Sequence, residues 1–303
     1  MIPDKGKHEI MDVSQYQPWV GRSEVCTDIA APEHYRAWLS TLDYKDLTVK
    51  DGVPMPPLAH LIFNKAIVQV SEVGRDGHPK RGDFLPPVAL PRRMWAGSKF
   101  EFRAPLRVGD KLAKRSEVVS VQAKTGSTGQ LVFLVLRHTT TSQSGGEVME
   151  EQTVVYRDDP KPAAAGEAPK PASAGAPSNS ARAPAPMPAA DFSRGVTPNE
   201  LMLFRYSALT FNGHRIHYDS PYAKEVEGYP GLVVHGPLLA TLMVDLVARE
   251  LPSEKVEAFE FTARQAVTLP TSITVNGKRE GKSVSLWIEN KGAAAVTGKV
   301  TLR

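Results

Sequence analysis

One segment near the middle of the chain constrains the fold more than any other feature. Residues 159–190 consist almost entirely of Ala, Pro, Gly and Ser. Such a composition cannot bury enough apolar surface to offset the conformational entropy lost on ordering. It predicts a flexible linker that would span roughly 30 Å as a coil, or alternatively an interaction segment placed mid-chain. We therefore expect two domains, residues 1–158 and 196–303, joined by a disordered segment at 159–195.

The two flanks of this linker carry the same pattern. The run FEFRA at 100–104 and the run FEFTA at 259–263 are each followed by a turn and by segments of alternating polar and apolar residues. This alternation predicts half-buried antiparallel strands. The expected strands are 112–123, 130–141 and 147–157 in the first half, and 272–279, 283–290 and 294–302 in the second.

Each half also has an apolar segment with helical spacing ahead of its strands. Residues 236–250 predict a long helix that opens at Pro237, where the missing N–H needs no partner. Residues 57–69 predict its counterpart in the first half, and residues 31–42 an earlier helix. Each half is therefore expected to contain a helix followed by an antiparallel sheet, which is an α+β pattern.

The first half contains a long insertion between its expected helix and its sheet. The segment 71–95 is rich in Gly and Pro, which predicts a loop, and loops of this length are usually functional or disordered. Arg92, Arg93 and Trp95 at its end are candidates for contacting a ligand in the neighbouring domain. The alternative is a solvated basic turn with Trp95 packed beneath it.

The segment 204–236 contains the most informative motif. Asn212, His214 and His217 fall in the run FNGHRIHYD, and His235 and Gly236 open the expected long helix. This arrangement resembles the R-specific enoyl-CoA hydratase, or MaoC-like, family. The similarity is closer to a subgroup that includes the itaconyl-CoA and 3-methylfumaryl-CoA hydratases and the mitochondrial 3-hydroxyacyl-thioester dehydratases. The resemblance implies a double hotdog, with two antiparallel sheets each wrapped around a central helix.

The expected chemistry needs an acid–base group and a donor for an enolate-like oxygen. His217 is the candidate acid–base residue, because a histidine exchanges protons near neutral pH. Gly236 is the candidate oxyanion donor, because a helix N-terminus presents unpaired N–H groups and Pro237 has none. The absence of a side chain at Gly236 also allows a thioester to approach closely.

The motif departs from the wider family at Asn212, where a carboxylate is usual. An amide cannot be a general base, so we expect Asn212 to orient water while His217 exchanges the proton. Another group could assist, and Asp219 is the next candidate. His60 in the first half has no such motif ahead of it, so that half is expected to form the acyl-CoA groove without catalysing the reaction itself.

Several neighbouring residues are candidates for substrate binding. Arg205 and Arg215 could pair with a carboxylate or phosphate, or form local ion pairs. His214 and His235 are candidates for substrate contact, although a lone histidine ahead of a helix is often structural. No set of cysteines and spaced carboxylates accompanies the histidines, so no metal site is expected.

The sequence therefore predicts a reversible hydratase of a short dicarboxylic enoyl-CoA, such as itaconyl-CoA or 3-methylfumaryl-CoA. The alternatives are a 3-hydroxyacyl-thioester dehydratase acting on CoA or a carrier protein, a thioesterase, and a non-catalytic acyl-thioester binding protein. No cofactor is expected, because CoA arrives as part of the substrate. We also expect the two hotdog units to pair within one chain. This internal pairing is compatible with a homo-oligomer.

Composition argues against other classes of partner. The net charge is only +4 and the basic residues are scattered, which disfavours nucleic acid. No apolar run is long enough to cross a membrane, and the first residues lack the apolar core of a secretory signal. The single cysteine, Cys26, fits a reducing compartment, so we expect a cytoplasmic protein.

Overall fold

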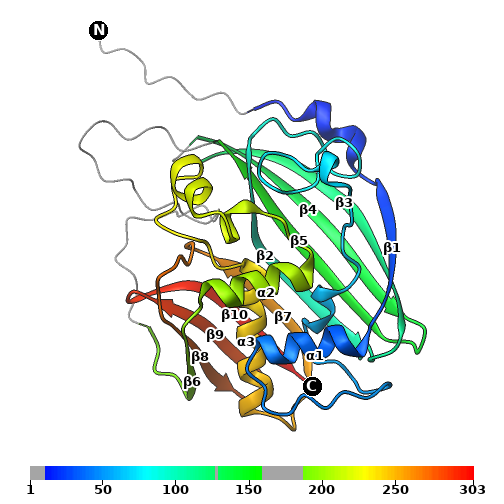
Figure 1. The fold of residues 1–303 in the computed structure, drawn as a ribbon, viewed down its shortest axis with the longest axis vertical. Coiled ribbons are helices and arrows are strands. Elements are labelled where there is room, and N and C mark those ends of the chain that lie inside the picture. The colour runs from blue at the N-terminus through cyan, green and yellow to red at the C-terminus, as the bar shows by residue number, and fades with distance from the viewer. Residues whose placement is uncertain (1–10, 127–128, 159–186) are drawn as a thin grey trace.

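The computed structural model describes residues 11–126, 129–158 and 187–303. One ten-stranded sheet runs through the whole molecule, with strand order β1-β3-β4-β5-β2-β7-β10-β9-β8-β6 (Figure 1). The first half supplies β1 (Ser23–Ile29), β2 (Arg92–Ala104), β3 (Lys111–Gly126), β4 (Gly129–Ser142) and β5 (Glu147–Arg157). The second half supplies β6 (Phe192–Val196), β7 (Val256–Ala263), β8 (Ile273–Glu280), β9 (Ser283–Asn290) and β10 (Ala293–Leu302). All six strands expected after the two FEF runs are present, close to the expected bounds.

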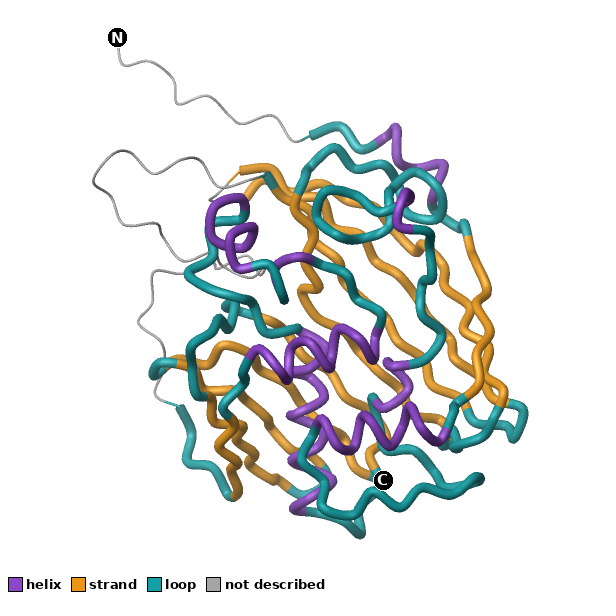
Figure 2. Tube along the Cα trace, in the orientation of Figure 1, coloured by secondary structure: helices purple, strands orange, loops and turns teal. Residues whose placement is uncertain are grey.

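The helices lie together on one face of the sheet (Figure 2). The α-helices are α1 (Pro32–Thr41), α2 (Glu200–Thr210) and α3 (Gly236–Glu250). The short helical turns are η1 (Ser14–Trp19), η2 (Ala59–Ile62), η3 (Val70–Glu72), η4 (Arg215–His217) and η5 (Tyr222–Val226). No helix within the described residues combines the length and apolar character that a membrane crossing requires.

The two FEF runs pair with each other. β2 and β7 are antiparallel neighbours, and Phe100 lies opposite Phe259 with ring centroids 6.2 Å apart. This seam joins the two half-sheets, so the pairing of hotdog units is internal to the chain. The expected double hotdog is therefore present, with the additional feature that its sheets are continuous.

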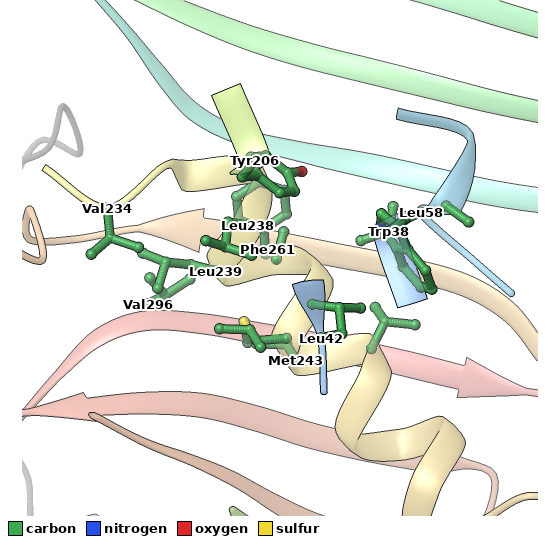
Figure 3. Packing of buried hydrophobic residues seen from close by; sticks show 14 of the residues in the cluster. Trp38, Leu42, Leu58, Tyr206, Val234, Leu238, Leu239, Met243, Phe261 and Val296 are labelled. Carbon is green, nitrogen blue, oxygen red and sulfur yellow. The ribbon is translucent and has the colours of Figure 1, made fainter. Parts of the chain in front are cut away.

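The expected long helix in the second half is confirmed as α3. Every residue from 238 to 247 is buried, as expected for a helix that the sheet covers. Figure 3 shows Leu238, Leu239 and Met243 packed among Phe261 of β7 and Val296 of β10. Residues of the first half, including Trp38 of α1, belong to the same apolar cluster. The halves therefore share one core.

The expected helix at 57–69 is wrong. Only the short turn η2 forms there, because Leu58 and Asn64 take left-handed backbone conformations with φ of 69° and 51°. Pro56 and Pro57 also disfavour helical geometry in the residues before them. Ile67, an apolar residue of this segment, is 74% exposed. The first half therefore has no counterpart of α3 among its described residues, so the expectation that each sheet wraps around a central helix is correct only for the second half.

Two segment boundaries also differ from expectation. The run beginning at Arg92 is the start of strand β2 rather than the end of a loop. β6 begins at Phe192, so the end of the expected 159–195 linker is part of the sheet. Residues 159–186 of that expected linker lie outside the described residues.

Candidate active site

The motif that contains Asn212 follows a helix with well-defined ends. Asn199 begins α2 by accepting a hydrogen bond at its side-chain oxygen from the N–H of Met202, at 2.9 Å. Phe211 ends the helix in a left-handed conformation with φ of 52°. The backbone N–H of Asn212 then donates to the carbonyl oxygen of Ser207 at 2.9 Å, which turns the chain back across the helix end.

His217 lies at the end of η4 and is anchored to the segment that leads into α3. Its Nδ1 is 2.7 Å from the carbonyl oxygen of Val233, so Nδ1 carries the proton and donates. Nε2 then retains its lone pair and makes no hydrogen bond within the described residues. The side chain is 6% exposed. Burial, followed by the neighbouring His235 and His214, lowers the pKa of His217 well below its ordinary value.

His235 immediately precedes α3 and stacks on His217. The two ring centroids are 3.6 Å apart with an interplanar angle of 19°. Nε2 of His235 lies 2.8 Å from Oγ of Ser207 on α2, whereas its buried Nδ1 has no partner among the described residues. Burial lowers the pKa of His235 to about 3. The stacked imidazoles are therefore both neutral near pH 7, and His217 lies at the N-terminus of the central helix.

Gly236 opens α3 beside this pair. A Cβ built on Gly236 would meet nothing closer than the carbonyl oxygen of Trp95, at 4.0 Å. The N–H of Gly236 belongs to the first turn, which lacks intrahelical acceptors, and Pro237 has no N–H. Trp95 of β2 thus brings the first half of the chain next to the helix start. Its indole donates to Oγ of Ser98 at 2.7 Å.

His214 connects this site to two acidic residues that sequence analysis missed. Its Nε2 lies 3.3 Å from Oε1 of Glu227, and Oε2 of Glu227 lies 3.3 Å from Nε of Arg92. The ring of His214 is also 4.1 Å from that of His78, whose Nδ1 lies 3.0 Å from Oδ2 of Asp76.

We call His78, His214, His217 and His235 the histidine row. Consecutive ring centroids along it are 4.1, 5.4 and 3.6 Å apart.

Both carboxylates beside the row are held ionised. Burial opposes ionisation of Glu227, but the hydrogen bond from His214 and the charge of Arg92 outweigh it and lower the pKa. Burial likewise opposes ionisation of Asp76, but the hydrogen bonds from His78 and the charge of Arg93 hold the pKa far below the usual value. Arg92 itself is 2% exposed, and its two terminal nitrogens have no partner among the described residues.

Asp76, His78 and His214 also raise the question of a metal. One potential ligand atom from each lies within 4.8 Å of the others. However, Asp76 and His78 already satisfy each other at hydrogen-bond distance, and His214 is paired with Glu227. The positive charge of Arg93 beside Asp76 and His78 further disfavours a second cation. These contacts support a hydrogen-bonded group rather than a cation site.

The remaining predicted site residues lie in different surroundings. Asp219 accepts a hydrogen bond from Nη2 of Arg215 at 2.7 Å and from the N–H of Tyr222 at 3.1 Å. Arg215 and Asp219 thus form a local ion pair, which is the alternative to substrate binding by Arg215. Arg205 is exposed and borders a surface hollow of about 210 Å³ whose lining includes Arg194 but no histidine. The structure thus brings together Asn212, His214, His217, His235, Gly236, Arg92, Arg93 and Trp95, and leaves Arg205 apart.

The fold and the row of histidines at the central helix define a class, the hotdog hydratases and dehydratases. Residues 58–269 match the family model described as hydroxyacyl-thioester dehydratase type 2, and the chain belongs to this family. It is therefore a hydro-lyase, as the sequence predicted.

The chain is 34% identical over 294 residues to the mesaconyl-C(4)-CoA hydratase of Chloroflexus aurantiacus, covering 96% of this chain and 99% of the relative. It is 39% identical over 97 residues to the mitochondrial hydroxyacyl-thioester dehydratase type 2 of Schizosaccharomyces pombe, about 31% of each chain.

Solved structures support the fold. A structure described as a MaoC-like dehydratase superposes with a TM-score of 0.65 at 14% identity, covering 95% of this chain and 99% of the other. A protein from Mycobacterium tuberculosis described as a double hotdog fold gives a TM-score of 0.55 at 15% identity, covering 93% and 96% of the two chains. At this level of identity, the similarity establishes the double hotdog architecture.

Proposed function

We propose that the protein is an acyl-CoA hydratase that adds water reversibly to a short dicarboxylic enoyl-CoA, such as itaconyl-CoA or 3-methylfumaryl-CoA. The observation that carries this proposal is the state of His217. Its Nδ1 donates to a backbone carbonyl, which leaves Nε2 unprotonated, and its ring stacks on His235, the residue that precedes the central helix. A neutral imidazole with a free Nε2 is the form that a general base requires.

The reaction needs one base and one oxyanion donor. In the hydration direction, Nε2 of His217 takes a proton from water while the water oxygen bonds to Cβ. The electron pair of the double bond moves toward Cα and the thioester oxygen, which the N–H of Gly236 stabilises. The proton then passes from His217 to Cα. Dehydration is the reverse, which is consistent with a family described as dehydratases.

The charge around the histidine row supports a substrate with a free carboxylate. Arg93 acts electrostatically on both Asp76 and His78, so its guanidinium lies beside the row. Arg92 already has Glu227 as its carboxylate partner, which makes the partly exposed Arg93 the better receptor for an acyl carboxylate. The similarity to a mesaconyl-C(4)-CoA hydratase over nearly the full chain points to the same substrate class. The cytoplasmic location and any homo-oligomer stay predictions.

The test compares the wild type with His217→Ala on 3-methylfumaryl-CoA, itaconyl-CoA and crotonyl-CoA. We expect His217→Ala to lower kcat at least about 100-fold, the usual size of an acid–base contribution. His34→Ala removes a partly exposed imidazole on α1 and is the matched control. Hydration unchanged by His217→Ala would exclude His217 from the mechanism. Preference for monocarboxylic acyl chains would favour the 3-hydroxyacyl-thioester dehydratase instead, and release of free thiol would indicate a thioesterase.

A further inference from the structure

A small hairpin in the first half of the chain reaches the motif of the second half. Residues 72–80 form this hairpin, in which the N–H of Lys80 donates to the carbonyl oxygen of Glu72 at 2.9 Å. At its tip, the carbonyl oxygen of Asp76 accepts from the N–H of Arg215 at 2.9 Å. The hairpin is therefore bound to the backbone of the Asn212 motif, and its position relative to that motif is fixed.

The contact at the hairpin tip requires glycine. Gly77 has φ of 89°, and a Cβ built on it would lie 1.8 Å from the carbonyl oxygen of Gly213. A Cβ on Gly213 would in turn lie 2.7 Å from the carbonyl oxygen of Gly77. Two backbones can approach this closely only where both residues lack side chains. This approach is what places His78 against His214.

His78 has the geometry of an oriented acceptor. Its Nδ1 lies 3.0 Å from Oδ2 of Asp76, which is held as a carboxylate, so Nδ1 donates and Nε2 keeps its lone pair. The side chain of His78 is 20% exposed. His78 also contributes to the lowered pKa of His217, after burial, His235 and His214, which places the two histidines within electrostatic reach.

Asn212 is tied into its own turn. Its Oδ1 accepts the N–H of His214 at 3.0 Å, so one of the two lone pairs of this oxygen is committed to the backbone. The amide N–H₂ can donate to one lone pair of the water oxygen while the other lone pair attacks Cβ. A second acceptor beside His217 would hold the remaining O–H of the reacting water.

We propose that His78, oriented by Asp76, is the acceptor that holds the reacting water beside His217, so that the first half of the chain contributes directly to catalysis. This inference rests on the proposed hydratase function. One O–H of the water donates to His78 and stays intact, becoming the product hydroxyl. The other O–H breaks and its proton passes to His217 and then to Cα, as its oxygen bonds to Cβ. His78 ends the cycle with the protons it began with.

The experiment uses the full chain and three substitutions in the hairpin. In His78→Ala we expect kcat for 3-methylfumaryl-CoA hydration to fall by about tenfold with little change in KM, less than the roughly 100-fold or more typical of an acid–base group, because His78 exchanges no proton. His78→Gln should recover part of this loss, because the side-chain amide oxygen is an acceptor. Lys80→Ala, which removes an exposed ammonium 3.9 Å from Glu72 of the same hairpin, should leave kcat unchanged.

The outcomes separate this inference from the function on which it rests. If His217→Ala is inactive while both His78 variants keep wild-type kcat, His78 has no role with water and the hydratase function stands. A wild type that hydrates none of the three enoyl-CoA substrates would overturn both. Stoichiometric zinc in the purified protein that is lost in Asp76→Asn would show that Asp76, His78 and His214 form a metal site instead. Should His78→Ala fail to fold, His78→Gln alone decides.

Discussion

Replacing Gly236 by alanine should separate the activity of the protein from its stability. A Cβ at this position meets only the carbonyl oxygen of Trp95, at 4.0 Å, which is an ordinary contact. The backbone of Gly236 is not among those with positive φ, so alanine introduces no strain. Because alanine restricts the unfolded chain more than glycine does, the free energy of unfolding should be unchanged or rise by about 0.5 kcal/mol.

The activity should respond in the opposite direction. If the thioester oxygen accepts the N–H of Gly236, a methyl group beside that N–H displaces the substrate. A displacement of about 1 Å costs roughly 100-fold in rate, and loss of a whole oxyanion donor costs roughly 100- to 1000-fold. We therefore expect kcat/KM for 3-methylfumaryl-CoA to fall by about 100-fold, while the melting temperature stays at or above the wild-type value.

The assay follows the loss of the enoyl thioester absorbance in wild type, Gly236→Ala and Gly195→Ala. Gly195 is the matched control, because a Cβ on this exposed residue of β6 meets nothing within 4 Å. We expect Gly195→Ala to keep full activity. A Gly236→Ala protein that folds normally and retains wild-type kcat/KM would refute the assignment of Gly236 as the oxyanion donor.

Two further predictions concern stability. Asp245 of α3 has a side chain 1% exposed and accepts hydrogen bonds from three residues, which are Tyr44, Arg194 and Arg249. Asp245→Asn should lower the free energy of unfolding by about 3 kcal/mol, measured by urea denaturation, because the arginines lose their counter-charge; an unchanged value would contradict this. Burial lowers the pKa of His60 to about 3. The unfolded chain therefore takes up a proton below about pH 6.5 that the folded chain does not, and stability falls as the pH drops. The loss of unfolding free energy between pH 7.5 and pH 5 should be about 2 kcal/mol smaller in His60→Gln than in the wild type, and an equal loss in both would contradict a neutral buried imidazole.

Much of the fold follows from local pattern. The strands and α3 were predictable because each buries one face or the whole of its surface, and burial leaves a period in the sequence. The segment 57–69 has the same apolar spacing and is not a helix. Leu58 and Ile62 are buried there by a short turn whose left-handed residues leave no periodic signal. Apolar spacing therefore established burial at this position but not the conformation that achieves it.

The site was predictable only where it is contiguous in sequence. Asn212, His217 and Gly236 lie within one short motif, whereas Asp76 and His78 precede it by more than 130 residues. Their contact depends on two backbones meeting at glycine, which a single sequence does not reveal. The only local signal was an Asp-Gly-His run inside a long loop, where the glycine permits a tight turn.

The two halves share a strand pattern, but only the second half has a long helix packed against its sheet. This difference explains why the chain has a single site to which both halves contribute. The second half keeps α3, whose first turn supplies the unpaired N–H and whose preceding residue stacks on His217. The first half has no such helix in its described residues, so its long connection is available to approach its neighbour. The seam between β2 and β7 fixes Trp95 beside the start of α3, and the hairpin at 72–80 fixes His78 at the other end of the histidine row. Residues of the first half therefore contact both ends of the histidine row. Asn212, His217, His235 and Gly236 all lie in the second half, but the second half alone would form an incomplete site.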